Sequence, residues 1–310
     1  MDKKRIIFMG TPEIAADVLE ALINTDNEIV LAVTQPDKKT GRKQVLTPSP
    51  VKQLAEKHNI PVFQPGRIRE DHQAVLDADA DLIVTCAYGQ IVPDAVLDAA
   101  RFGAVNLHGS LLPAYRGGAP IQRAIWDGLD VSGMTLMKMA SKMDAGPVLD
   151  TETVEITDKD DSGSIFKKMG KAAASLIVKD LDVLLSGEAR FIDQDEEKAT
   201  YAPTIKKEEE KLDLDAEDLK VFNQVRALAP APGAYVIAKG RKLKILKARL
   251  VPGVVGDIHT FVSTDKKSLG IQLNDHILSL ETVQLQGKPV MSVKDFMNGQ
   301  GRSLPGTLAA

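Results

Sequence analysis

Short apolar runs alternate with amphipathic helical patterns through the first 190 residues, and this alternation constrains the fold more than any other feature. Helical patterns of ten or more residues separate the runs, and the clearest one follows Pro12 and extends to Ile23. Strands that are bounded by glycine and separated by helices are typical of βαβ units and a parallel sheet. We therefore predict a doubly wound, mostly parallel α/β domain over residues 1–189. Its expected buried strands are Arg5–Gly10, Glu28–Thr34, Asp81–Gly89 and Gly103–Gly109.

The end of this domain is marked by a long helical pattern and a polar stretch. The pattern covers Asp161–Gly187, with Ser162 or Ser164 as the expected N-cap and Gly187 as the end. The polar stretch runs from Glu188 to Asp215 and contains KKEEEK at Lys206–Lys211, and residues 190–209 are expected to be a linker. A second domain at 210–310 begins with a short helix that ends at Leu228. Its short β patterns and turns favour a small β-barrel or sandwich.

Composition limits the class of protein. With 44% hydrophobic and 26% charged residues over 310 positions, the chain has a globular composition. No run approaches the roughly 18 apolar residues of a membrane span, and the apolar stretch in MDKKRIIFMG is too short for a signal peptide. Cys86 is the only cysteine, which excludes an internal disulfide and a thiolate metal cage. We expect a cytoplasmic protein without a membrane partner.

The net charge of −4 hides an asymmetry along the chain. Residues 201–310 contain 16 Lys and Arg against 12 Asp and Glu, whereas residues 1–200 contain 23 against 31. The cations are densest in KGRKLKILKARL, Lys239–Leu250, which has six cations and no acid. Two interpretations stay open: lysines can keep the edge strand of a sheet soluble, or the stretch binds a polyanion.

The first strand-to-helix turn, FMGTPEIAAD, argues against a dinucleotide site. The dinucleotide fingerprint needs three glycines, and this turn has only Gly10. The second strand does not end in an acid that is placed for a ribose. We therefore expect Gly10 only to permit a tight turn.

The stretch NLHGSLLPAYRGGAP, Asn106–Pro120, carries the strongest indication of chemistry. Residues i and i+2 of a strand project from one face, so Asn106 and His108 should point together while Val105 and Leu107 pack the other way. Ligands of open α/β sheets bind at the carboxyl ends of the strands. The amide and the imidazole should therefore face a crevice.

Acid–base chemistry fits this pair better than a serine nucleophile or a metal site. Ser110 lacks the G-x-S-x-G turn of a nucleophile, and the other histidines lack metal-ligand spacing. His108 can act as a general acid or base, and Asn106 can donate a hydrogen bond to a developing oxyanion. These two side chains suit an acyl transfer in which the substrate supplies the nucleophile, for example an amine. Asp144, in MKMASKMDAGPVL, is the candidate carboxylate for orienting or protonating the imidazole, and an Asx-turn is its alternative role.

Four stretches give the chain a resemblance to a known family. NLHGSLLPAYRGGAPIQRAI and MDAGPVL, with GTPEIAADVL near the start and TQPDKKTGRKQVLTPSPVK at 34–52, make it similar to the methionyl-tRNA formyltransferases over essentially its whole length. The N-x-H-x-S-L-L-P pattern with a downstream Asp is shared by the superfamily that uses 10-formyltetrahydrofolate, and the 34–52 loop and basic C-terminal domain narrow it to the tRNA enzymes. The resemblance implies a Rossmann-like formyltransferase fold and an OB-like barrel that holds tRNA.

The resemblance also implies roles for single residues. It assigns catalysis to Asn106, His108 and Asp144, and the wall of the folate pocket to Ser110, Leu111, Leu112 and Pro113. It implies formyl transfer from 10-formyltetrahydrofolate, without a metal, to the α-amine of charged initiator methionyl-tRNA, and we expect the protein to act as a monomer. The expected tRNA contacts, in a mobile basic loop from Pro36 to Pro48 and in the barrel, are Lys38, Lys39, Arg42, Lys43, Lys242, Lys244 and Lys247.

Two departures from the family pattern lie near the domain junction. Where the family commonly has NPWPGA this chain has APAPGA at 229–234, and KLDL replaces a frequent I-D-W, so a tRNA-stacking or interdomain contact by tryptophan is in doubt. Two alternative functions also stay open. One is a formyltransferase that acts on a sugar amine or a purine precursor and needs no basic second domain. The other is an inactive tRNA-binding homologue, which the complete polar triad disfavours.

Overall fold

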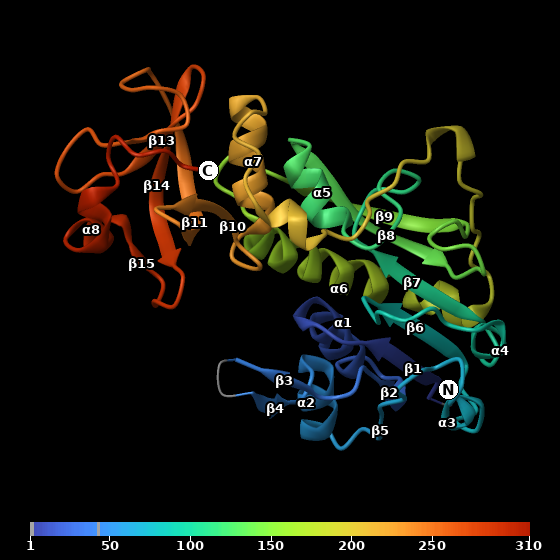
Figure 1. Ribbon diagram of the computed structural model, residues 1–310. Helices are drawn as coiled ribbons and strands as arrows, with labels where there is room; N and C mark the ends of the chain where they lie inside the picture. The colour runs from blue at the N-terminus through green and yellow to red at the C-terminus, as the bar shows by residue number, and fades with distance from the viewer. Residues whose placement is uncertain (1–2, 42–43) are drawn as a thin grey trace. The chain divides into compact units, whose positions relative to one another are not determined.

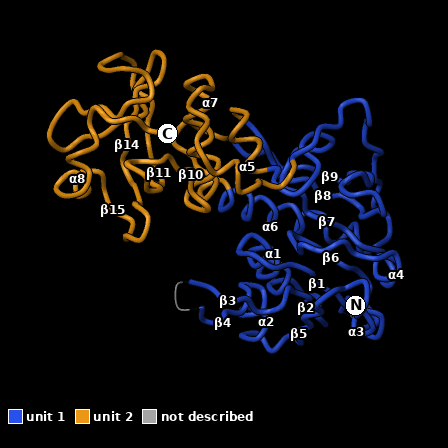
Figure 2. Tube along the Cα trace, viewed as in Figure 1, with its two compact units in different colours: residues 1–120, 131–155, 166–202 blue, residues 121–130, 156–165, 203–310 orange. Residues whose placement is uncertain are grey.

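The computed structural model describes residues 3–41 and 44–310, which form two compact units. Unit 1 comprises residues 1–120, 131–155 and 166–202, and unit 2 comprises residues 121–130, 156–165 and 203–310 (Figure 2). Residues 190–202, the first part of the stretch expected to be a linker, fold with unit 1. Within the described residues, no helix is long and apolar enough to cross a membrane.

Unit 1 is built on a seven-stranded sheet with the order β5-β2-β1-β6-β7-β8-β9 (Figure 1). The pairs β7–β8 and β8–β9 are antiparallel, and all other neighbours are parallel. The predicted doubly wound, mostly parallel sheet is thus confirmed. Its strands are β1 (Arg5–Gly10), β2 (Glu28–Val33), β5 (Val62–Phe63), β6 (Leu82–Cys86), β7 (Ala104–His108), β8 (Val131–Lys138) and β9 (Val148–Glu155).

Helices cover both faces of this sheet. Ile7 and Met9 of β1 belong to one buried cluster with Val75 and Val96, whose helices lie on that face. The alternate residues of β1 project from the opposite face and are also fully buried, and α1 contacts β1. The helices are α1 (Glu13–Ile23), α2 (Pro50–Lys57), α3 (Gln73–Leu76) and α4 (Asp94–Leu97), with α5 (Pro120–Trp126) and α6 (Ser162–Ser186) at points where the chain passes between the units.

Gly10 is required for close packing, so the prediction that it only permits a tight turn was wrong. A Cβ at this position would lie 2.6 Å from the Cβ of Ala15 and 2.9 Å from the carbonyl oxygen of Cys86. The missing side chain therefore lets α1 approach β1 and β6 closely.

The N-cap of α6 also differs from the prediction. The Asp161 carboxylate accepts a hydrogen bond from Ser164 N at 2.8 Å, and the Ser164 hydroxyl accepts one from Asp161 N at 3.1 Å. The Ser162 hydroxyl instead donates to the Ala229 carbonyl at 2.6 Å. Asp161 therefore caps the helix, and Ser164 returns the bond as in a capping box.

The segment expected to be a basic loop contains an antiparallel hairpin of β3 (Lys38–Thr40) and β4 (Val45–Thr47). Its base is tied down because Lys52 Nζ lies 2.8 Å from Asp37 Oδ2 and Gln64 Nε2 donates to Asp37 Oδ1 at 2.7 Å. The side chains of Lys38 and Lys39 are exposed. The two other cations predicted to contact tRNA here, Arg42 and Lys43, lie outside the described residues.

Unit 2 contains an antiparallel sheet with the order β10-β11-β14-β13-β12, on which β15 also pairs with β14. Residues 307–310 close it into the predicted small β-barrel, because they bond to both edges: Ala309 N donates to His259 O at 2.8 Å beside β12, and Ala310 N donates to Ile237 O of β10 at 3.2 Å. The elements are β10 (Ala234–Ala238), β11 (Arg241–Pro252), β12 (Phe261–Val262), β13 (Gly270–Gln272), β14 (His276–Leu285), β15 (Met291–Ser292), α7 (Asp218–Leu228) and α8 (Val293–Met297).

Candidate active site

The carboxyl end of β7 presents the predicted amide and imidazole. β7 lies between β6 and β8, with Asn106 opposite Thr85 and His108 opposite Thr135. Its alternate residues, including Leu107, are buried in the core as the alternation predicts. The His108 side chain is only 6% exposed, so its ring nitrogens depend on protein or substrate groups for hydrogen bonds.

Both ring nitrogens of His108 face acceptors. Nε2 lies 3.0 Å from the carbonyl oxygen of Tyr115, and Nδ1 lies 3.5 Å from Asp144 Oδ1. A carbonyl can only accept, so Nε2 carries a hydrogen. The ring is therefore held between a backbone carbonyl and a carboxylate.

Asp144 reaches His108 from the turn after β8. Its backbone has φ of +52°, and its Oδ2 accepts a hydrogen bond from Gly117 N at 2.8 Å. Gly117 has φ of +119°, and a Cβ there would lie 2.8 Å from the carbonyl oxygen of Ala202. A side chain at this position would therefore disturb the hydrogen bond from Gly117 N to Asp144. The carboxylate thus binds groups that are remote in sequence, rather than serving its own turn as in the Asx-turn alternative.

A buried threonine orients the Asn106 amide. The Thr85 hydroxyl, on a residue that is 2% exposed, donates to Asn106 Oδ1 at 2.8 Å. Because Thr85 holds the amide oxygen, the orientation of the Asn106 amide is set. Its Nδ2 has no hydrogen-bond partner among the described residues. Thr85 was not predicted as a site residue, although a lone hydroxyl in the apolar run LIVTC was a signal.

The residues predicted to line the folate pocket form a pinned loop. The Ser110 hydroxyl donates to the Ala114 carbonyl at 2.6 Å, which leaves it poorly suited to be a nucleophile. The Thr135 hydroxyl donates to Ser110 O at 2.6 Å and accepts from Leu112 N at 3.1 Å. The side chains of Leu111, Leu112 and Pro113 are half-buried, so their apolar surface is partly available.

Nothing nearby suggests thiol chemistry. Cys86 is fully buried in β6, and this burial raises the pKa of its thiol to about 12. A thiolate at this position is therefore strongly disfavoured at neutral pH. Over residues 3–41 and 44–310, no cluster of three or more His, Cys, Asp or Glu side chains could hold a metal ion.

The basic stretch of unit 2 forms β11. Within this strand, the side chains of Leu243 and Ile245 are buried in the core of unit 2. β10 pairs with β11 over Arg241–Ile245, so the sheet-edge interpretation is wrong for Lys242 and Lys244. From Lys247 onward the described strand pairs with β14 alone, and that interpretation stays open there. Each of the three predicted tRNA-binding lysines has a partner: Lys242 Nζ lies 3.8 Å from the centroid of the Tyr235 ring, Lys244 Nζ donates to the Pro232 carbonyl at 2.6 Å, and Lys247 Nζ lies 3.3 Å from Glu281 Oε2.

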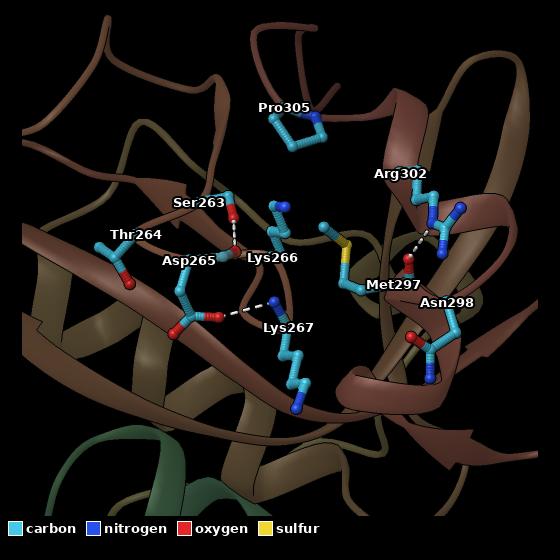
Figure 3. Close-up of a pocket in the computed structure, with 9 residues that line it drawn as sticks. All are labelled: Ser263, Thr264, Asp265, Lys266, Lys267, Met297, Asn298, Arg302 and Pro305. Carbon is cyan, nitrogen blue, oxygen red and sulfur yellow. Dashed lines mark hydrogen bonds between the residues drawn. The ribbon is translucent and has the colours of Figure 1, made fainter.

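A second group of cations lines a hollow in unit 2 (Figure 3). The Asp265 carboxylate accepts from the backbone N–H of Lys267, and Arg302 Nε donates to the Met297 carbonyl at 3.2 Å. Lys266 and Lys267 form no ion pair with another described side chain. The lining residues are Ser263, Thr264, Asp265, Lys266, Lys267, Met297, Asn298, Arg302 and Pro305.

Sequence comparisons identify the family to which this arrangement belongs. The Formyl transferase family matches residues 4–181, and the Formyl transferase, C-terminal domain family matches residues 204–301. The methionyl-tRNA formyltransferase of Staphylococcus epidermidis is 40% identical over 305 residues, 97% of this chain and 98% of its own, and that of Lactiplantibacillus plantarum is 43% identical over 303 residues, 95% of each chain. The chain belongs to the methionyl-tRNA formyltransferase family. The resemblance seen in the sequence motifs is thereby confirmed for both domains.

Solved structures with the same fold are more distant in sequence. HypX from Aquifex aeolicus has a TM-score of 0.72 at 15% identity, over 98% of this chain and 50% of its own. WlaRD, a sugar 3N-formyl transferase with dTDP and 5-N-formyl-THF, has a TM-score of 0.67 at 18% identity, over 93% of this chain and 100% of its own. At these identities the likeness establishes the fold alone.

Proposed function

We propose that this protein, in the cytoplasm, transfers the formyl group of 10-formyltetrahydrofolate to the α-amino group of charged initiator methionyl-tRNA. Membership of the methionyl-tRNA formyltransferase family supports the acceptor. The observation that carries the chemistry is the His108–Asp144 pair on the site that also presents the Asn106 amide. Of the nearby described residues, Ser110 donates its hydroxyl hydrogen to Ala114 O and Cys86 is buried, so neither is suited to be a nucleophile. The nucleophile is then the neutral amine of the substrate.

The amine nitrogen attacks the formyl carbon, and the carbonyl electron pair moves onto the oxygen. Asn106 Nδ2 donates to this oxyanion, because Thr85 engages the other end of the amide. When the tetrahedral intermediate collapses, the bond from the formyl carbon to N10 breaks. The amine loses its proton, and N10 gains one.

His108 mediates this proton movement. Its Nδ1 faces Asp144, so Nε2 is the nitrogen that meets the substrate, and it exchanges its bond to the Tyr115 carbonyl for one to the reacting groups. Asp144 orients the imidazole, which passes a proton from the attacking amine to the leaving N10. The pinned stretch Ser110–Pro113 forms the wall against which the folate lies.

The acceptor is tested by measuring labelled formyl incorporation from 10-formyltetrahydrofolate into a panel of amine acceptors. The panel contains initiator methionyl-tRNA, elongator methionyl-tRNA, another charged tRNA and a nucleotide-linked amino sugar. We expect incorporation into initiator methionyl-tRNA alone. Preference for the amino sugar would replace the proposed acceptor, and no transfer to any acceptor would indicate an inactive homologue.

The catalytic assignment is tested with Asn106→Ala and Asp144→Asn. Loss of one oxyanion donor lowers kcat by about 10²–10³, and we expect a comparable loss when the carboxylate charge beside His108 is removed. tRNA affinity should stay near that of the wild type, because neither residue is proposed to bind tRNA. Near-normal turnover in either variant would contradict its role.

We further propose that the hairpin lysines Lys38 and Lys39, together with Arg42 and Lys43, bind the acceptor stem, and that β11 binds tRNA phosphates through Lys242, Lys244 and Lys247. The test measures tRNA affinity against salt concentration. Lys242→Ala with Lys244→Ala should weaken binding and flatten the salt dependence by about one to two counterions. The matched control, Lys266→Ala with Lys267→Ala, should have the smaller effect. A larger effect in the control would move the contact to the hollow of Figure 3.

A further inference from the structure

Residues 192–202, here called the returning segment, hold the two loops that flank His108 within unit 1. Ile192 and Val148 exchange two backbone hydrogen bonds of 2.8 Å at the start of β9. Further along, the Thr200 hydroxyl accepts from Tyr115 N at 2.9 Å, and Thr200 O accepts from Arg116 N at 2.9 Å. The segment therefore fixes the backbone of Tyr115, whose carbonyl oxygen bonds His108 Nε2.

Gln194 of the same segment holds the turn that carries Asp144. Its Nε2 donates to the carbonyl oxygens of Asp144 at 2.9 Å and Gly146 at 2.7 Å. Asp144 has φ of +52°, which residues other than glycine adopt at a cost, so this turn needs support from outside. A Cβ at Gly146 would lie 1.9 Å from the Lys138 carbonyl oxygen, so the turn is also tightly packed.

A buried guanidinium fixes the Gln194 amide in turn. Arg116 is 1% exposed, and its Nε and Nη2 donate to Gln194 Oε1 at 3.1 and 2.8 Å. Its Nη1 and Nη2 also donate to the Glu196 carboxylate, with Nη2 at 2.8 Å from Oε1. The amide therefore makes four hydrogen bonds, and its orientation is determined by the donors on one side and the carbonyls on the other.

We infer that Gln194 is a positioning residue for formyl transfer, which keeps the Asp144 carboxylate in reach of His108 by clamping the Asp144–Gly146 turn to Arg116. Through Thr200 the returning segment also holds the second partner of the imidazole. The inference rests on the proposed function for the catalytic roles of His108 and Asp144. Gln194 touches no reacting atom and acts through the Asp144 carboxylate.

Gln194→Met tests the inference, because methionine has a similar length and makes none of the four hydrogen bonds. A displacement of the carboxylate by about 1 Å lowers kcat by roughly a hundredfold or somewhat less, and KM for the folate donor should stay within about twofold. In an Asp144→Asn background, Gln194→Met should cause little further loss, because both changes act through one group. Independent, multiplicative losses would overturn the inference.

Gln224→Met is the matched control. Gln224 is 2% exposed in unit 2, donates to the carbonyls of Glu209 at 2.9 Å and Lys211 at 2.8 Å, and accepts from Asp213 N at 3.1 Å. Both variants should lose thermal stability to a similar degree. Only Gln194→Met should lose kcat, and an equal loss in Gln224→Met would show a general effect of destabilisation.

A second measurement separates this inference from the proposed function, since it needs no turnover. The Gly117 N–H donates to Asp144 Oδ2, so its hydrogen exchange reports whether the carboxylate is in place. Gln194→Met should accelerate that exchange by about tenfold or more, and Gln224→Met should leave it unchanged. Unchanged Gly117 exchange in Gln194→Met would overturn the inference even if methionyl-tRNA proved not to be the acceptor.

Discussion

Replacing Thr85 with valine tests how the catalytic amide is oriented. The Thr85 hydroxyl donates to Asn106 Oδ1 at 2.8 Å and also lies 3.1 Å from the Val105 carbonyl oxygen. Valine has nearly the same shape, so the substitution removes the hydroxyl without opening a cavity. Asn106 remains present, but the preference of its amide for one orientation is lost.

The size of the effect follows from the single hydrogen bond. A bond between buried neutral groups contributes about 1 kcal/mol net, and about 1.4 kcal/mol corresponds to a factor of ten in rate. We therefore expect Thr85→Val to lower kcat by roughly five- to tenfold. This loss is much smaller than the 10²–10³ expected when the donor itself is removed.

Single-turnover formylation of methionyl-tRNA at saturating folate donor measures the effect on the chemical step. Thr85→Ser, which keeps the hydroxyl, should restore most of the rate. In an Asn106→Ala background, Thr85→Val should have almost no further effect, because the amide through which it acts is gone. A full tenfold loss in that background, or wild-type turnover in Thr85→Val, would refute the reasoning.

Three further predictions concern charge, reactivity and stability. Hydrogen bonds from Arg116 first, and then Lys142, hold the pKa of Glu196 down at about 2, so its stabilising effect is present above its ordinary value of 4.5 and is lost as pH falls toward 2. The difference in denaturation midpoint between wild type and Glu196→Gln should therefore shrink across that window. Thiol reagents should modify Cys86 at least about a hundredfold more slowly in the native than in the unfolded protein, since its thiol is buried; equal rates would contradict this. Asp161→Ala should cost about 1 kcal/mol in urea denaturation, and Asp161→Asn, which can still cap α6, should recover most of it.

Local patterns predicted four of the seven strands in the sheet of unit 1, together with the long helices α1 and α6. Arg5–Gly10 is β1 as predicted, and the end of α1 lies at Ile23. β1 is a continuous apolar run that is buried on both faces, and α1 is an amphipathic helix with one buried face, so the burial of apolar side chains determines both elements. The cap of α6 and the role of Gly10 were predicted wrongly, because both depend on neighbours that the local pattern does not specify.

Some residues of the candidate site could be predicted from the sequence, and others could not. Asn106 and His108 could be found from the sequence, since the period of a strand places them on one face and a glycine follows. Thr85 and Gln194 were missed. Each makes its contact across 21 or 50 positions of sequence, and such pairings depend on strand order and on the path of the returning segment.

The sequence by itself determined the α/β class, the two polar side chains at the end of one strand and the motifs of the family, because these follow from period, composition and local order. Only the tertiary structure decided that Asp144 turns back to within 3.5 Å of His108, and that Arg116 and Gln194 support this turn. It also decided that residues 307–310 close the barrel of unit 2. The physical reason is that hydrogen bonds between remote segments are selected by the packing of the whole unit, which no local preference of the chain encodes.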